Sequence, residues 1–339
     1  MIKTLTSWRG IFALCIVCFH FAMHEFDQMT YAGVTFFFML SGFLSAMHYD
    51  KGFNVKRFYK RRLWRIFPLH WLVLAAMIVL DLAMMHKFSY GWDLPLHVAL
   101  LQSWVPNPDI YFGYSIHSWF LSALLLCIVL TPLLLRFTVK WSLNMIWIVL
   151  LLAACVLIAL DLTCSSSLLS YTYVWPLARF IDYSMGIALF LTIDRLKWRE
   201  KMQKISTINS SLIEVVALTV LAIFIAIHAE GGVVTEKLEN APLWWIPVAL
   251  LIVVATVLNG HEGVVGKLLC LKPLLWLGGI SFEIYLLQKF VNNAFCYLVA
   301  PLFGHYGIMI YDYSFACTLP LLIVTAWIVH LLMKRLVKK

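Results

Sequence analysis

Arg9 and His20 are two side chains with chemical potential, and both stand in the first apolar segment of the chain. They are eleven positions apart, so on a helix they lie about 20° apart around the axis and roughly 16 Å apart along it. Arginine is a permanent cation, and histidine exchanges a proton near neutral pH. We therefore expect one helix face that joins a cationic inner site to a titratable outer one. The alternative is that Arg9 reaches lipid headgroups and His20 bonds a nearby carbonyl.

A dense basic cluster with interleaved aromatic residues spans positions 56–65 and includes Arg61, Arg62 and Arg65. Arg62 and Arg65 are three positions apart and therefore share a helix face. Two guanidinium groups on one face suit a phosphate or pyrophosphate ligand. The alternative is that the cluster only anchors the chain at the membrane surface.

Other polar side chains interrupt later apolar segments. Arg179 and Asp182 are three positions apart and are expected to form a structural ion pair. His117 precedes an apolar segment at the end where it could approach His20, and Glu283 places a carboxylate in a later segment. These residues are further candidates for a site between helices.

No metal site is expected. His24 follows His20 by four positions, a spacing that two zinc ligands on a helix can have, but the sequence identifies no third ligand. The eight cysteines fall mostly in apolar stretches, where free cysteines behave as small hydrophobic residues.

The composition requires lipid around these side chains. Hydrophobic residues make up 63% of the 339 positions and charged residues only 13%, whereas a soluble domain carries roughly a quarter charged residues. A spanning helix needs about 20 mostly apolar residues. Such segments lie near positions 8–24, 31–49, 66–85, 118–136, 143–162, 174–194, 212–229, 243–259, 274–299 and 314–333. We predict an all-α, polytopic integral membrane protein with about ten transmembrane helices.

The placement of charge predicts the orientation. With a cytoplasmic N-terminus, the amino-terminal stretch and the inner connections hold every lysine and arginine except Lys87, Arg179, Lys237 and Lys289. This asymmetry follows the positive-inside rule and places both termini in the cytoplasm. It also accounts for the net charge of +9 without a nucleic-acid partner. We expect one transmembrane domain over 1–339 with no attached soluble domain.

Several motifs together resemble the acyltransferase-3 family. Trp8 to Ala13 followed by His20 is similar to its first-helix signature of an arginine, ten residues and a histidine. The match continues in order through 33–44, Arg62 to Pro68, 119–122 with Pro132, and 277–286. The resemblance therefore covers nearly the whole chain.

The resemblance implies a multi-pass enzyme of the cell (inner) membrane. Such an enzyme moves an acyl group, usually acetyl, from cytoplasmic acyl-CoA to a hydroxyl of an envelope glycan or lipid-linked sugar. His20 would then serve as general base or transient acyl carrier, with Arg9, Glu283 and His117 as further catalytic candidates. The donor polyphosphate would bind inner cations, namely Arg9, Arg61, Arg62 and Arg65.

Two positions depart from the family pattern. Leu124 and Leu125 stand where a glutamate is common, and Gln288 stands where a histidine often ends the late motif. Glu283 could compensate for either loss.

Two other classes of function stay open. A transporter or flippase of a lipid-linked sugar would use Arg9, Arg179 and Asp182 along its pathway. A structural or assembly subunit would have no evident need for the retained arginines and His20.

Overall fold

The computed structural model describes residues 2–21, 27–49, 52–85, 91–299, 301–302 and 314–337, and this part of the chain contains helices but no strand. The long helices are α1 (Lys3–His20), α2 (Asp27–Met47), α3 (Val55–Met85), α6 (Ser118–Thr138), α7 (Leu143–Thr163), α9 (Pro176–Arg195), α11 (Thr207–Ala229), α13 (Trp245–Val257), α16 (Ser281–Ala294) and α18 (Ser314–Val337). Short helices join them: α4 (Leu94–Val98), α5 (Pro108–Tyr111), α8 (Ser166–Val174), α10 (Trp198–Lys201), α12 (Val233–Leu238), α14 (Val264–Leu269) and α15 (Lys272–Gly279). Single turns of other helix types lie at Gln102–Trp104, Pro242–Trp244 and Phe295–Val299.

Every predicted apolar segment is mostly helical over the part of the chain that the structure describes. Within the described residues, seven helices are long and apolar enough to cross a membrane, namely α2, α3, α6, α7, α9, α11 and α18. The segment predicted at 274–299 is instead a pair of helices, Lys272–Gly279 and Ser281–Val299, bent by 63°, and this pair makes an eighth span if it is counted as one. The all-α, polytopic class is therefore confirmed, while the count of ten stays a prediction.

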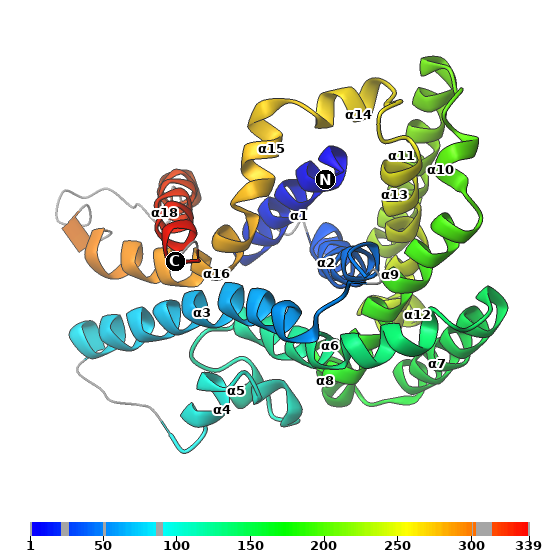
Figure 1. The fold of residues 1–339 in the computed structure, drawn as a ribbon. Coiled ribbons are helices and arrows are strands. Elements are labelled where there is room, and N and C mark those ends of the chain that lie inside the picture. The colour runs from blue at the N-terminus through cyan, green and yellow to red at the C-terminus, as the bar shows by residue number, and fades with distance from the viewer. Residues whose placement is uncertain are drawn as a thin grey trace.

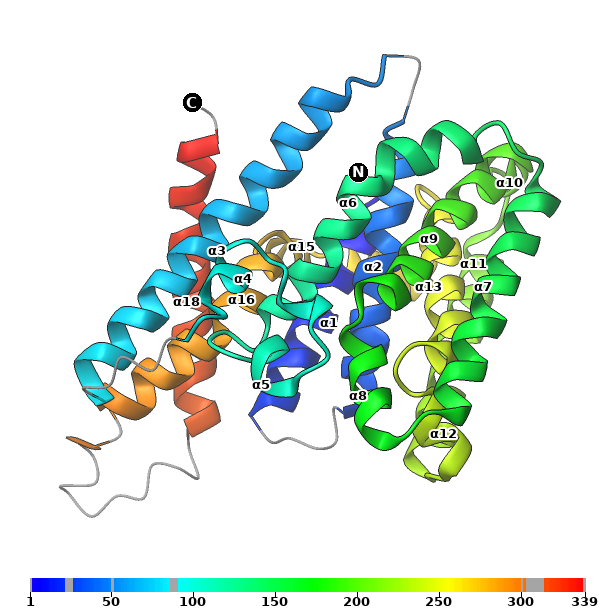
Figure 2. The same ribbon diagram turned by 90° about the horizontal axis from the view of Figure 1, so that it is seen from below.

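The connections lie on two sides of the bundle, as the charge pattern predicts. In Figure 2 the beginnings of α1 and α3, the short helix α10 and the end of α18 lie toward one side, and α8 and α12 lie toward the other. The first group contains the basic connections. The cytoplasmic assignment of that side and of both termini stays a prediction.

Helices α2 and α9 form the buried centre of the bundle, with α1 beside α2 (Figure 1). Their backbones approach closely because glycine stands at each crossing point. A Cβ atom added at Gly42 would overlap the backbone carbonyl of Tyr183, and one added at Gly186 would overlap that of Met39. Small residues allow this direct helix packing in a membrane protein, where van der Waals contact drives association.

Replacing Gly186 by alanine is therefore expected to push α9 away from α2 and to lower the free energy of unfolding by about 1–3 kcal/mol, the usual effect of overpacking. Thermal unfolding of the purified protein in detergent measures this change. Gly279→Ala is the matched control, since a Cβ there meets nothing within 4 Å. Equal unfolding temperatures for the two variants would contradict the close packing.

Candidate active site

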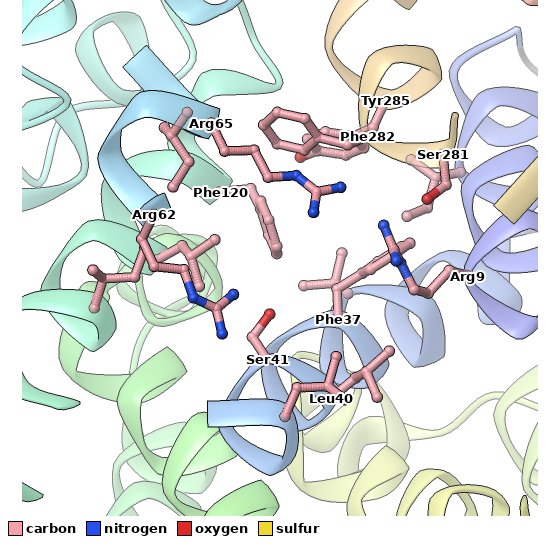
Figure 3. Close-up of a pocket in the computed structure, with 16 residues that line it drawn as sticks. Arg9, Phe37, Leu40, Ser41, Arg62, Arg65, Phe120, Ser281, Phe282 and Tyr285 are labelled. Carbon is pink, nitrogen blue, oxygen red and sulfur yellow. The ribbon is translucent and has the colours of Figure 1, made fainter. Parts of the chain in front are cut away.

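Three arginines converge on one cavity. Figure 3 shows Arg9 of α1 and Arg62 and Arg65 of α3 extending into the same space from opposite walls. The other lining side chains are mainly apolar and come from α1, α2, α3, α6 and α16: Ile16, Val34, Phe37, Leu40, Ser41, Leu44, Ile66, Phe120, Leu124, Ile128, Ser281, Phe282 and Tyr285. The cavity therefore combines three cationic side chains with an otherwise mainly apolar lining.

The two α3 arginines are held in different ways. Arg62 donates a hydrogen bond to Ser45 Oγ at 3.0 Å, and its guanidinium carbon lies 5.6 Å from the ring centre of Phe58. Arg65 lies over Phe282, at 5.7 Å from the ring centre. A contact between the face of a guanidinium and a ring leaves the in-plane N–H donors available. Both cations can therefore meet an anionic ligand in the cavity.

Of two further positions singled out in the sequence, Leu124 lines the cavity and Arg61 does not. Arg61, predicted with Arg62 and Arg65 as a phosphate ligand, has an exposed side chain and is absent from the lining of the cavity. Leu124, one of the two residues at the position of the family's glutamate, does line it. The departure from the family pattern thus makes this wall apolar.

His20 and His117 lie side by side at the opposite end of α1 from Lys3, with ring centres 4.3 Å apart. His20 Nδ1 is 3.0 Å from the carbonyl oxygen of Ile16. A carbonyl oxygen only accepts, so Nδ1 carries the proton and Nε2 keeps a lone pair. The His20 side chain is exposed, whereas His117 beside it is buried.

His117 is buried, and neither of its ring nitrogens has a hydrogen-bond partner within the described residues. Its backbone carbonyl accepts a hydrogen bond of 3.1 Å from the Tyr285 hydroxyl. Tyr285 also lines the arginine cavity. It therefore connects that cavity with the histidine pair, a role that the sequence did not indicate.

Glu283 is buried and bonds a residue that sequence reasoning missed. Its carboxylate accepts a hydrogen bond of 2.8 Å from Nδ1 of His330 in α18. The same carboxylate lies within electrostatic reach of Arg9. Gln288, which replaces the family's histidine, instead donates to the carbonyl of Tyr285 on its own helix at 3.0 Å. His330 thus supplies an imidazole beside Glu283 from a different helix.

Arg179 and Asp182 form the ion pair that their spacing predicts, at 3.0 Å, and both side chains are buried. The other Asp182 oxygen accepts a 2.6 Å hydrogen bond from the Trp245 indole. Arg179 also donates to the backbone carbonyl of Asn240 at 3.0 Å. Neither charged residue lines the arginine cavity. Through Trp245 and Asn240 the pair instead links α9 to the start of α13 and the segment before it.

Removing one partner should expose the structural role of this pair. Asp182→Ala leaves Arg179 charged and buried, and we expect a loss of about 3 kcal/mol in the free energy of unfolding. Replacing both residues by apolar ones, Arg179→Met with Asp182→Leu, should recover much of that loss. Thermal unfolding in detergent compares the variants. A single variant that unfolds like the wild type would show that the pair does not stabilise the fold.

The zinc alternative depends on His20 and His24. His24 lies outside the described residues. Among the residues that the structure does describe, no group of three or more histidine, cysteine, aspartate or glutamate side chains could hold a metal ion.

Comparison with known proteins agrees with the motifs. The acyltransferase-3 family, described as an acyltransferase domain, matches residues 2–333. The chain is 32% identical over 163 residues to the acyltransferase MdmB of Streptomyces mycarofaciens, an alignment that covers 43% of this chain and 42% of that protein. The chain therefore matches about two fifths of the length of this curated relative. No solved structure matches.

Proposed function

Because this chain belongs to the acyltransferase-3 family, we propose that it moves an acyl group, most simply acetyl, from cytoplasmic acyl-CoA to a hydroxyl of an extracytoplasmic or lipid-linked polysaccharide. The observation that carries the proposal is the arginine cavity, whose lining residue Tyr285 donates a hydrogen bond to the backbone carbonyl of His117, beside His20. Neither histidine lines the cavity, so the cations for a donor and the base for an acceptor would lie on either side of Tyr285. Its place would be the inner membrane of the cell.

The donor fits the cavity by chemistry. Acyl-CoA carries several phosphates on a long, largely uncharged arm that ends in a thioester. Arg62 and Arg65 would bind the phosphates, with Arg9 deeper along α1. The apolar lining would surround the arm and exclude water from the thioester. Arg61 lies outside this cavity and receives no donor contact in the proposal.

His20 would act on the acceptor. Its free Nε2 takes the proton from the sugar hydroxyl while the hydroxyl oxygen attacks the thioester carbonyl. The carbon–sulfur bond then breaks, and the CoA thiolate leaves and is protonated by the imidazolium. Each proton that His20 accepts is thus returned, and the products are an ester and free CoA. Glu283, bound by His330, would supply a negative charge near Arg9.

Mass spectrometry of envelope glycans tests the proposal. Cells express either the wild type or His20→Ala at matched membrane levels, and glycan fractions are searched for a base-labile acyl mass. We expect this mass only with the wild type, and its value identifies the acyl group. If every glycan fraction is the same in the two strains while a lipid-linked sugar crosses the membrane, the chain is a transporter and the proposal is wrong.

A further inference from the structure

The basic first half of α3 turns its cations to two different sides. Arg62 and Arg65 face the arginine cavity. At 100° per residue, another set of residues lies on the opposite side of the helix. In chain order this outer face carries Arg57, Lys60, Trp64, Phe67, Pro68 and Trp71, and Arg61 lies at its border, on the side toward Arg65. The cations proposed to bind the donor therefore face the cavity, and the cations of this outer face point away from it.

A groove runs along the outer face just beyond these cations. Its lining comes entirely from α3: Leu63, Trp64, Phe67, Pro68 and Trp71. Trp64 and Trp71 are 54% and 50% exposed, and the Trp71 indole donates to the carbonyl of Val98 at 3.0 Å. Pro68 has no N–H, so the Trp64 carbonyl lacks its usual helical donor. The groove is thus a shaped surface with a fixed indole at its far end.

Charge and apolar surface follow one another along this face. Arg57, Lys60 and Arg61 are exposed, and Lys60 precedes Trp64 by one turn of the helix. Figures 1 and 2 show α3 at the edge of the bundle, next to α16 and α18. A membrane lipid has the same order, with a phosphate at the surface and acyl chains below it. A net negative headgroup complements three neighbouring cations better than a zwitterionic one.

We propose that this outer face binds an anionic phospholipid of the inner leaflet, with its phosphate against Lys60 and Arg61 and one acyl chain in the groove between Trp64 and Trp71. Binding here requires no acyl transfer, so it can be tested on the resting protein. A bound lipid would pack against the same helical turns that carry Arg62 and Arg65 into the cavity.

Native mass spectrometry of the purified full-length protein measures binding of phosphatidylglycerol and phosphatidylcholine with identical acyl chains. The test variant combines Lys60→Gln with Trp64→Ala. The control variant, Phe137→Ala with Lys140→Gln, removes the same two kinds of side chain from exposed positions at the end of α6. We expect wild type and control to bind phosphatidylglycerol about tenfold more tightly than phosphatidylcholine, and the test variant to lose that preference.

Three results would overturn the proposal. Equal affinities of the wild type for the two lipids would show that the face does not select an anionic headgroup. Equal losses of phosphatidylglycerol affinity in the test and control variants would show that general surface charge, and not this face, determines binding. Tighter binding of a prenyl phosphate at the same residues would assign the groove to a lipid-linked substrate instead. If the test variant does not fold, Lys60→Gln alone, at an exposed position, should still weaken phosphatidylglycerol binding about fivefold.

Discussion

Replacing His20 by alanine is expected to lower kcat about a thousandfold, with little change in the KM for acyl-CoA or in the unfolding temperature. General base catalysis by a positioned side chain contributes about 10²–10⁴ to a rate. The 3.0 Å bond from Nδ1 to the Ile16 carbonyl leaves Nε2 as the proton acceptor. Transfer of a labelled acyl group from acyl-CoA to an acceptor glycan in proteoliposomes measures both constants.

His48→Ala is the matched control for this experiment. His48 bonds the carbonyl of Leu44, four residues earlier on its helix, through Nδ1 at 2.6 Å, as His20 does with Ile16. It is exposed and lies outside the arginine cavity, so its removal should leave kcat unchanged. Partial recovery of His20→Ala by added imidazole would further support the role of the base. A His20→Ala enzyme with wild-type kcat would show that another group accepts the proton.

The features that sequence reasoning anticipated depend on local periodicity. The eleven-residue spacing of Arg9 and His20 places them along one helix, and the three-residue spacing of Arg179 and Asp182 allows the observed ion pair. The approach of His117 to His20 was also expected, because His117 opens its predicted span at the outer face and His20 lies toward the outer end of the first span. In each case a regular helix of known pitch converts sequence distance into position.

The features that sequence reasoning missed depend on contacts between distant segments. His330 meets Glu283 across a separation of 47 positions, and the sequence contains no pattern that aligns α18 with α16. The bend after Gly279 divides one predicted span into two helices. Arg61 was grouped with Arg62 and Arg65 because the three share a cluster; it lies about 100° from Arg62 but only about 40° from Arg65 around the helix, so spacing alone does not exclude it from the cavity. The rotation of a helix about its own axis, relative to the neighbouring helices, decides which cation faces a cavity. The sequence pattern of a single segment does not give that rotation.

Replacing both Arg62 and Arg65 by glutamine is expected to raise the KM for acyl-CoA by about two to three orders of magnitude, with kcat within a few-fold of the wild type. A hydrogen bond to a charged group contributes about 1.5–3 kcal/mol, so each arginine is expected to account for at least about tenfold in donor binding. The effect should fall on binding because His20 and His117 stay in place at the other end of α1. Initial rates over a range of acyl-CoA concentrations separate the two constants.

Lys56→Gln with Arg57→Gln is the matched control, because it removes two cations of the same cluster whose side chains are exposed and outside the arginine cavity. Exposed charges act on a ligand through the surface potential, which salt screens. A KM that rises equally in both double variants and converges at high ionic strength would assign donor attraction to the surface. A large rise confined to Arg62→Gln with Arg65→Gln, and persisting in salt, would assign it to hydrogen bonds inside the cavity, because desolvated contacts are screened much less than exposed ones.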